Sequence, residues 1–305
     1  MPRRHDPDPP LPQLTLLSQA RSAGMTVHQV RQRLRTGEWW SAGRGAYAQV
    51  STGVLLSELD GFDRARAEHV FRSVAAALRN PGSVVTDASA ALCRGLAVHR
   101  IPKHVQLAVP PDHWTGSRSG IDFRAREFEE GEVNVQRVPI ASALRSWVDI
   151  TRFGSLVEAL VTGDSGTRNG LFDSPIETID VDRWRGRWGG RRIRTAAPLV
   201  DGTRESPLES WSFAYFVECG LPLPSMQVEI RTDSGRFIAR VDFFWEQYGL
   251  IGEADGKLKY LEPGDLFAEK RREDALRTEG FRVVRWGAAD LRGPDLARTL
   301  SRLLR

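Results

Sequence analysis

The pattern of apolar and polar residues is most informative between Val241 and Tyr260, VDFFWEQYGLIGEADGKLKY. An apolar run carries one carboxylate, Asp242, and a polar turn leads into a second run. That run delivers Glu253, Asp255 and Lys257 at two-residue spacing. Side chains alternate across a strand, so these three are expected to share one face. The pattern predicts two adjacent strands that bring Asp242 close to the other carboxylates, where hard cations such as Mg²⁺ find oxygen ligands.

The remainder of the C-terminal third alternates between helical and strand patterns. Ser206-Pro207-Leu208-Glu209 is a helix start, with serine as N-cap, proline at N1 and glutamate at N3. A capping role for Glu209 would satisfy the Ser206 amide. The elements expected after it are the rest of this helix to Gly220, strands Met226–Arg231 and Phe237–Trp245, the strand carrying Glu253, a helix Asp265–Glu279, a buried strand Phe281–Trp286 and a closing helix Leu291–Leu304.

The N-terminal region predicts a helix-turn-helix with a wing. Met1–Pro12 is proline-rich and charged, and we expect a disordered lead-in there. Leu14–Ala23 is typical of a helix that Gly24 ends, and Thr26 is a good N-cap for a second helix to Thr36. The segment Trp39–Ala48 then has the pattern of a short hairpin. Two helices and a wing indicate a winged helix-turn-helix.

The second of these helices is the candidate DNA-binding element. Its apolar stripe is expected to consist of Val27, Val30 and Leu34. The opposite side presents basic residues, and the hairpin adds one more, so the candidate DNA contacts are Arg31, Arg33, Arg35 and Arg44. The alternative is a small helical pair whose basic face is merely solvated.

The middle of the chain shows mixed helical and strand patterns without a catalytic cluster. His99 and His104 flank Pro102, and without a carboxylate or cysteine partner they favour surface polarity over a metal site. The expected elements are a helical segment Ser57–Asn80, a strand–turn–helix Val84–Gly95 capped by Thr86 or Asp87, a strand Val105–Val109, a loop Pro110–Gly120 and an amphipathic helix Ile140–Arg152.

The most basic short window is Val181–Thr195, in which six arginines interleave with Trp184 and Trp188. Arginine pairs with phosphate and tryptophan stacks on bases or guanidinium planes, so this window could contact nucleic acid. The equally open alternative is a connector whose tryptophans pack on the next domain. Asp201–Glu205 is expected to be a hinge.

Composition narrows the classes of protein. A chain of 305 residues with 41% hydrophobic content indicates two or three domains with real cores. Two distant cysteines, Cys93 and Cys219, argue for a reducing cytoplasm and against a disulfide framework. A net charge of +4 and a pI of about 9.4 fit a polyanionic partner such as DNA. The absence of a long apolar run predicts a cytoplasmic protein with no membrane partner.

The carboxylate pattern resembles the PD-(D/E)XK nuclease core, and the element order over 206–305 resembles the branch related to very-short-patch-repair endonucleases. The resemblance implies a restriction-endonuclease-like α/β domain with a mixed central sheet and a Mg²⁺ cofactor, with Mn²⁺ as an alternative. It implies metal ligation by Asp242, Glu253 and Asp255, with a contribution from Glu209. Lysine positions are the departure from the pattern. If Glu253 is the D/E of the motif, Asp255 stands where lysine is expected, whereas Asp255-Gly256-Lys257 is a literal match.

Several cations near this motif are candidates for the same site. Lys257 or Lys259 could serve as the catalytic lysine, or both could form a phosphate-binding edge. Arg285, in the expected closing strand, is a candidate for binding a phosphate or a carboxylate. The candidate catalytic set is therefore Glu209, Asp242, Glu253, Asp255 and Lys257, and the candidate DNA contacts here are Lys259 and Arg285.

The N-terminal order of helix, glycine, helix, Gly-x-Trp and GRGAYA resembles AbiEi-type antitoxins of type IV toxin–antitoxin systems, and 86–152 resembles their body. The combined organisation is a lead-in (1–12), a winged helix-turn-helix (13–50), an α/β middle domain (51–180), a basic linker (181–205) and the nuclease-like domain (206–305). Two functions remain open. One is a DNA-binding, Mg²⁺-dependent endonuclease. The other is a non-catalytic transcriptional regulator or antitoxin with a degenerate nuclease fold and a cognate toxin partner.

Overall fold

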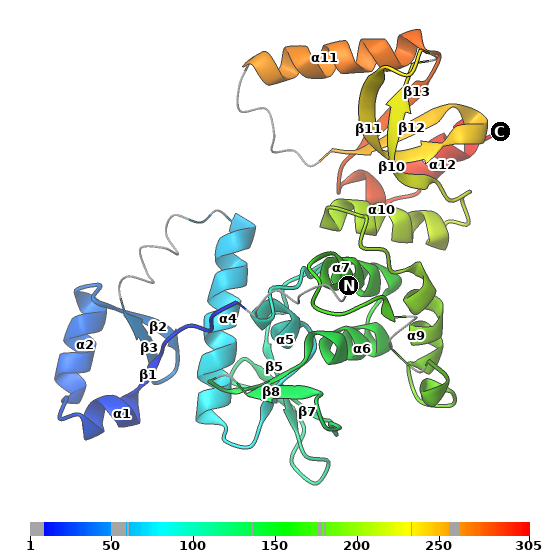
Figure 1. The fold of residues 1–305 in the computed structure, drawn as a ribbon. Helices are drawn as coiled ribbons and strands as arrows, with labels where there is room; N and C mark the ends of the chain where they lie inside the picture. Colours follow the sequence, from blue (N-terminus) through cyan, green and yellow to red (C-terminus); the bar gives the residue numbers. More distant parts are fainter. Residues whose placement is uncertain are drawn as a thin grey trace.

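The computed structural model describes residues 9–49, 59, 61–135, 137–175, 179, 181–232, 234–255 and 263–305. These residues form a mixed α/β structure whose strands belong to three sheets, of three, six and four strands. The sheets follow one another along the chain, and each is associated with its own helices (Figure 1). In the described part of the chain, no helix is long and apolar enough to cross a membrane.

The N-terminal sheet has the strand order β1-β3-β2. The expected helix from Leu14 begins later, because Thr15 and Leu16 form a short strand paired with β3. The second helix starts as predicted, since the Thr26 hydroxyl accepts a hydrogen bond from the Gln29 amide at 3.2 Å. The elements are β1 (Thr15–Leu16), α1 (Leu17–Ser22), α2 (Val27–Arg35), β2 (Trp39–Gly43) and β3 (Ala46–Gln49). Of the disordered lead-in expected over residues 1–12, residues 1–8 lie outside the described residues, but Leu11 packs against the core of the middle region and the Pro12 carbonyl accepts a hydrogen bond from Arg137 at 3.4 Å.

One residue of the apolar stripe predicted on α2, Val27, is exposed rather than buried. Val30 is buried and Leu34 is half-buried, but Val27 is 41% exposed. Val27 is the first residue of the helix, beside the N-cap, where the side chain extends beyond the small core formed by Ala20, Val30 and Trp39.

The middle region is built on a six-stranded sheet of order β6-β7-β5-β4-β9-β8. Two boundaries differ from the sequence expectation. Gly116–Arg118, expected in a loop, is an exposed strand paired with β7, and Ile140 belongs to a strand before the amphipathic helix. The elements are α4 (Gly61–Arg79), β4 (Val84–Val85), α5 (Asp87–Cys93), β5 (Val105–Val109), β6 (Gly116–Arg118), β7 (Ile121–Ala125), β8 (Val133–Val135), β9 (Pro139–Ala141), α6 (Ala143–Phe153) and α7 (Leu156–Arg168).

The basic segment expected as a linker is folded onto the middle region. It contains η1 (Val181–Trp184), α9 (Gly190–Ala196) and η2 (Ala197–Leu199). Trp184 and Ile193 are buried in the same hydrophobic core as residues of α6 and α7. The alternative expected the tryptophans to pack on the next domain, but Trp184 packs in a core with α6 and α7 of the middle region, and Trp188 is 62% exposed.

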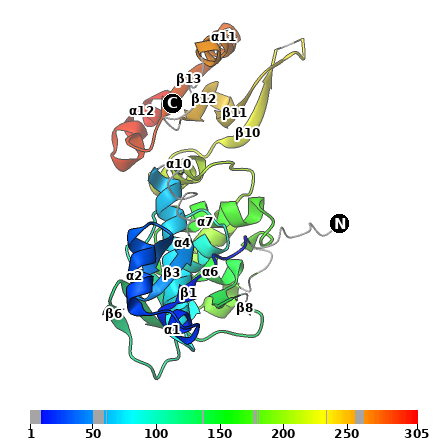
Figure 2. The same ribbon diagram turned by 90° about the vertical axis from the view of Figure 1, so that its left-hand side faces the viewer.

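The C-terminal region contains a mixed sheet of order β10-β11-β12-β13. Strands β10, β11 and β12 are antiparallel, and β12 pairs in parallel with β13. Helix α10 lies between this sheet and α7 (Figure 1, Figure 2). The elements are α10 (Pro207–Glu218), β10 (Ser225–Arg231), β11 (Phe237–Trp245), η3 (Glu246–Tyr248), β12 (Leu250–Ala254), α11 (Pro263–Thr278), β13 (Arg282–Trp286), η4 (Asp290–Arg292) and α12 (Asp295–Leu303).

Aromatic packing fixes the sheet against α10. The ring of Phe216 makes edge contacts with Phe243, Trp245 and Trp286 at centroid distances of 5.4 to 5.6 Å. Gly252 is required beside them, because a Cβ there would lie 2.4 Å from the Trp286 ring. The closing strand is less buried than expected: β13 is an edge strand, and within it only Trp286 is fully buried.

The expected hinge before α10 is anchored by an ion pair. Arg204 donates from Nε to Asp164 Oδ2 at 2.6 Å, and the two side chains are 1% and 0% exposed. The Asp201 amide donates to the same carboxylate at 2.8 Å. A buried carboxylate that loses its cation remains desolvated and unpaired, which is costly.

We therefore expect Arg204→Ala to lower the free energy of unfolding by about 3–5 kcal/mol, because Asp164 stays buried without its partner. Urea denaturation followed by circular dichroism measures the change. The matched control is Arg185→Ala, which breaks an ion pair to Asp182 at 2.7 Å whose side chains are 75% and 66% exposed. The control should leave the free energy of unfolding nearly unchanged, because water screens an exposed ion pair. Equal losses in the two variants would contradict the anchoring role.

Candidate functional site

Asp242 and Glu253 come together as the sequence predicted. Phe243 of β11 pairs with Gly252 of β12, and continuing this antiparallel register places Asp242 opposite Glu253. The Ala254 amide donates a hydrogen bond to Asp242 Oδ2 at 2.9 Å, which ties the carboxylate to the end of β12. Two carboxylates from adjacent strands are therefore neighbours on one face of the sheet.

Glu209 adds a third carboxylate from the first turn of α10. The Glu209 amide donates to the Ser206 hydroxyl at 3.1 Å, so the predicted N-cap is confirmed. The expected return bond to the Ser206 amide is not the one formed. Glu209 Oε2 instead accepts from the Glu205 amide at 2.9 Å and from the Gln227 side chain at 2.8 Å. The reach to Gln227 turns the carboxylate toward the sheet, and Glu209 is only 5% exposed.

The pKa of Asp242 is raised by its burial and by the carboxylates around it. Burial raises the pKa of Asp242 to about 6, the hydrogen bond from Ala254 opposes the rise, and the negative charges of Glu209 and Glu253 add to it. Desolvation and like charges both disfavour an ionised carboxyl group. Asp242 consequently exchanges its proton close to neutral pH, and a cation beside it would be strongly favoured.

Glu253 is balanced by two arginines. Arg272 of α11 donates to Oε1 at 2.9 Å, and Arg285 of β13 donates to Oε2 at 2.7 Å. Arg285 also pairs with Glu273 at 2.9 Å. Of the two partners expected for Arg285, a carboxylate is the one present. Glu253 is 8% exposed, so these ion pairs compensate a charge that would otherwise be costly to bury.

The rest of the motif diverges from the expected strand geometry. Strand β12 ends at Ala254, so Asp255 does not continue the face of Glu253 as expected. Asp255 is exposed, and its amide donates to the Trp286 carbonyl at 2.9 Å. Lys257 and Lys259 lie outside the described residues.

The donor chemistry fits Mg²⁺ as a two-carboxylate site. Among the described residues, no group of three or more Asp, Glu, His or Cys side chains is arranged to hold a metal ion. Mg²⁺ does not need such a cage, because it is usually bound by one or two carboxylates together with water and substrate phosphates. Asp242 supplies a hard oxygen donor in the negative field of Glu209 and Glu253, which Arg272 partly offsets. Glu253 would supply the second once an arginine exchanged its partner.

The candidate DNA contacts at the N-terminus divide into two kinds. Arg31, Arg35 and Arg44 are exposed, the last in the turn between β2 and β3. Arg33 instead packs within its own region, with its guanidinium 5.1 Å from the Trp39 ring centroid and its Nε 3.4 Å from Glu38. In both views α2 lies far from the C-terminal sheet (Figure 1, Figure 2), so these arginines and the carboxylates form separate sites.

His99 and His104, the two histidines that flank Pro102, lie in separate environments. Within the described residues, neither belongs to a group of side chains that could hold a metal ion. His104 has a carboxylate partner that sequence spacing did not reveal, because its Nδ1 lies 2.9 Å from Asp122 Oδ1. His99 packs edge-on against Trp211 at 4.6 Å, and burial lowers its pKa.

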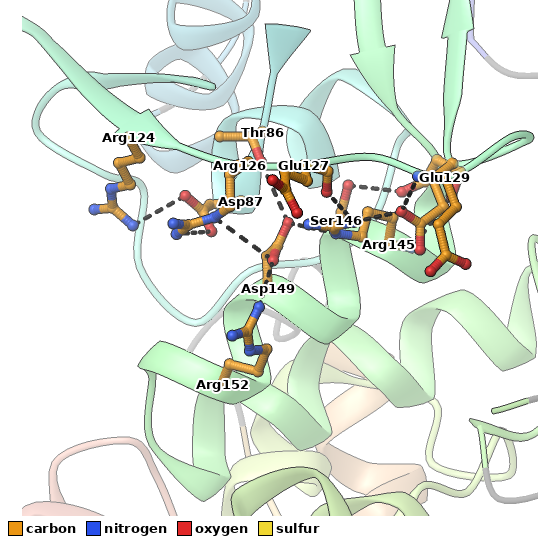
Figure 3. A network of polar contacts seen from close by, with 12 residues as sticks. Thr86, Asp87, Arg124, Arg126, Glu127, Glu129, Arg145, Ser146, Asp149 and Arg152 are labelled. Carbon is orange, nitrogen blue, oxygen red and sulfur yellow. Dashed lines mark hydrogen bonds and ion pairs between the residues drawn. The ribbon is translucent and has the colours of Figure 1, made fainter. Parts of the chain in front are cut away.

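A buried charge network in the middle region was missed by the sequence reasoning. Figure 3 shows Asp149 pointing from α6 toward Asp87 and Arg126. Arg145 donates to Asp149 at 2.9 Å, and Arg124 donates to Asp87 at 2.9 Å. Burial and the neighbouring charge of Asp87 raise the pKa of Asp149. The only local signal was charged residues within an amphipathic helix, and their partners come from distant elements.

This network is incompletely hydrogen-bonded at its centre. Arg126 lies 3.6 Å from both Asp87 Oδ1 and Asp149 Oδ1, which is close enough for ion pairing but long for a hydrogen bond. Asp87 Oδ1, Asp149 Oδ1 and Arg126 Nε make no hydrogen bond within the described residues. The backbone of Asp87 has a φ of +49°, an uncommon value for a residue other than glycine. The arrangement holds β7, α5 and α6 together through charge.

Comparison with known proteins gives limited coverage. No protein-family model matches the chain. Two uncharacterized proteins of Mycobacterium tuberculosis, MT2308 of strain CDC 1551 / Oshkosh and Rv2248 of strain ATCC 25618 / H37Rv, are each 31% identical to this chain over 138 residues. The match covers 45% of this chain and 50% of each relative, so the chain spans about half the length of the curated relatives it matches.

A solved structure also shows a remote likeness. The crystal structure of the RV2827C protein from Mycobacterium tuberculosis aligns with 72% of this chain and 84% of its own, at 13% sequence identity and a TM-score of 0.35. Function must therefore be inferred from the residues of this chain.

The raised pKa of Asp242 has a testable consequence for stability. Between about pH 4 and about pH 6 the folded protein keeps a proton on Asp242 that the unfolded chain has lost. The contribution of this group to the free energy of unfolding is therefore fully present below about pH 4 and is lost as the pH rises through about 6. Relative to Asp242→Asn, wild type should lose about 1–3 kcal/mol of unfolding free energy between about pH 4.5 and about pH 7.5. Urea denaturation at both pH values measures this difference. Glu229→Gln, at a 55% exposed carboxylate, is the control. A pH-independent difference between wild type and Asp242→Asn would contradict the burial of a titrating carboxyl.

Proposed function

We propose that this chain is a DNA-binding protein whose C-terminal region hydrolyses phosphodiester bonds with Mg²⁺, and with Mn²⁺ as a substitute. The observation that carries the proposal is the convergence of Glu209, Asp242 and Glu253: burial raises the pKa of Asp242 to about 6, and the negative charges of Glu209 and Glu253 add to the rise. Strongly perturbed carboxyl groups beside one another are typical of catalytic and metal-binding sites. Because Asp242 and Glu253 come from adjacent strands, the rigid sheet fixes their separation.

The order of elements supports the same proposal. A helix, three antiparallel strands, a second helix and a parallel strand follow one another from Pro207 to Trp286. This is the order that PD-(D/E)XK nucleases of the patch-repair-like branch share, with the acidic residues on the second and third strands. The restriction-endonuclease-like assignment of 206–305 is part of the proposal.

Different residues of the proposed site would bind the metal ion and stabilise the phosphate. Asp242 and Glu253 would hold Mg²⁺, which supplies polarisation of a phosphoryl oxygen and acidification of a bound water. Glu209, held by Gln227 at 2.8 Å, keeps the surrounding field negative and so favours the divalent cation. Arg272 and Arg285, on release from Glu253, are within reach of a phosphate that enters the same site, where their guanidinium groups would stabilise developing negative charge.

The N-terminal region would deliver the DNA. Helices α1 and α2 are followed by the β2–β3 hairpin, which is the element order of a winged helix-turn-helix. Within it α2 would be the recognition helix, and Arg44 at the tip of the hairpin would contact the backbone. Arg31 and Arg35 are exposed on α2, as phosphate contacts require.

The second candidate is a non-catalytic regulator or antitoxin that binds DNA and a cognate toxin. The observation that favours it is the compensation of Glu253 by Arg272 and Arg285, because a carboxylate bound to two arginines is a weak metal ligand. The presence of Asp255 at the position where the nuclease pattern has lysine also favours this second candidate. On this alternative the C-terminal sheet is a scaffold whose charges serve stability.

Metal-dependent cleavage separates the two candidates. Wild type should nick supercoiled plasmid with Mg²⁺ or Mn²⁺ and lose this activity in EDTA, whereas Asp242→Asn and Glu253→Gln should abolish it because each removes a metal-holding charge. Glu229→Gln, at an exposed carboxylate on β10, should cleave like wild type. Mg²⁺ should raise the melting temperature of wild type by mass action and leave both site variants nearly unchanged. Absence of both nicking and stabilisation by Mg²⁺ in wild type would establish the regulator instead.

Duplex binding tests the N-terminal assignment on its own. Replacing Arg31 and Arg35 with alanine should weaken duplex binding and reduce its salt slope by up to about two, since each phosphate contact contributes about 0.9. Fluorescence anisotropy over a range of salt concentrations measures both quantities. Arg21→Ala, an exposed arginine on α1, is the control for a change in net charge alone. If the double variant keeps the wild-type slope, α2 is not the recognition helix.

A further inference from the structure

Three exposed aromatic side chains mark one region of the surface on the middle part of the molecule. Trp114 is 56% exposed, Phe153 39% and Trp188 62%. They come from the loop before β6, the end of α6 and the turn before α9. Large apolar groups that gather on an exposed surface are typical of binding sites. Neither the nuclease proposal nor the antitoxin alternative assigns them a role.

Ring contacts join these side chains into one track. Trp188 lies against Phe153 at a centroid distance of 4.7 Å, and Trp114 lies against Phe123 at 5.9 Å. Phe123 and Phe153 both line one shallow hollow of about 530 Å³, together with Arg124 and Arg126. The aromatic surface therefore runs from Trp114 across the hollow to Trp188.

Guanidinium groups accompany the rings along the track. Arg118 lies 5.3 Å from the Trp114 centroid, Arg126 lies 4.3 Å from Phe153, and Arg192 lies 5.4 Å from Trp188. Arg152 lies 5.2 Å from Phe153, and its Nε donates to the Trp188 carbonyl at 3.2 Å. These contacts hold the rings in place and put a positive charge beside each of them.

The balance of charge on the track is positive. Its arginines are Arg118, Arg124, Arg126, Arg152 and Arg192. The acids among them are Asp122, which also pairs with His104, and the buried Asp87 and Asp149. Because those two aspartates lie beneath the surface, they orient Arg124 and Arg126 without presenting negative charge to solvent. Glu127 and Glu129 line a neighbouring hollow that shares Arg126 and Arg152 with the track and adds Arg145 and Arg187.

We propose that this track, from Trp114 across Phe153 to Trp188, binds single-stranded nucleic acid. Bases would stack on the exposed rings, and the exposed arginines beside the two tryptophans, Arg118 and Arg192, would contact the phosphates. Exposed base faces exist in single strands but are covered by neighbouring pairs in a duplex, so a row of rings and guanidinium groups selects the single strand. This site is independent of α2 and of the carboxylates near Asp242, and it requires no metal.

Anisotropy of a labelled oligothymidine, measured in EDTA, tests the proposal with the full-length chain. Trp188→Ala and Trp114→Ala should each weaken binding by about five- to 150-fold, as expected for loss of one stacked base. The matched control is Phe237→Ala on β11, because Phe237 is 51% exposed and has Arg231 at 5.7 Å from its ring. The control should bind like wild type. Melting temperatures should be unchanged in all three variants, since each side chain is exposed.

The contribution of the phosphates is measured separately. Arg118→Ala with Arg192→Ala should lower the salt slope by about 0.7 for each phosphate that is no longer neutralised, and by about 1.4 together. Asp242→Asn should bind the oligonucleotide as wild type does, so the outcome is independent of the nuclease proposal. Wild-type affinity in both tryptophan variants would overturn the inference. Polyglutamate of equal length competing as well as oligothymidine would also overturn it, because such a surface would recognise charge without bases.

Discussion

The cost of burying a carboxylate organises this molecule. Asp87, Asp149, Asp164 and Glu253 are all less than a tenth exposed, and each has an arginine partner. These pairs bring together elements that are distant in the chain, because the carboxylate and its cation usually come from different helices or strands. A carboxylate buried without its cation would cost several kcal/mol, so the arginines are as necessary to the fold as the apolar core.

Glu209 and Asp242 differ from these paired carboxylates. Within the described residues their side chains are bound by amide groups, from Glu205, Gln227 and Ala254, and form no ion pair with an arginine or lysine. The compensation used elsewhere is therefore missing where two such groups adjoin. Burial raises the pKa of Asp242 to about 6, and the negative charges of Glu209 and Glu253 add to that rise. On the nuclease proposal, a divalent cation from solution would supply the missing positive charge.

Local sequence patterns predicted the features that depend on neighbouring residues but not those that depend on contacts between distant elements. The Ser206 and Thr26 caps and the alternation along β11 depend on neighbouring residues, so they were predictable and are confirmed. The ion pairs of Glu253 could not be predicted, because its partners Arg272 and Arg285 come from α11 and β13 and meet it only in the folded structure. The same holds for Asp87 and Asp149, which are on separate helices. Exposed two- and three-residue strands such as β6 carry too little apolar pattern to be detected.

The arrangement of the regions constrains how the proposed activities could work together. Helix α2 and the C-terminal sheet lie far apart in both views (Figure 1, Figure 2). A duplex held by α2 would therefore reach the C-terminal site only along a path over the middle region. Arg272 and Arg285 both donate to Glu253, and a phosphate that entered this site would compete with Glu253 for them. On this account the ion pairs weaken Glu253 as a metal ligand, and nucleic acid that released them would strengthen the binding of Mg²⁺. Free protein would bind Mg²⁺ less well than protein with its substrate.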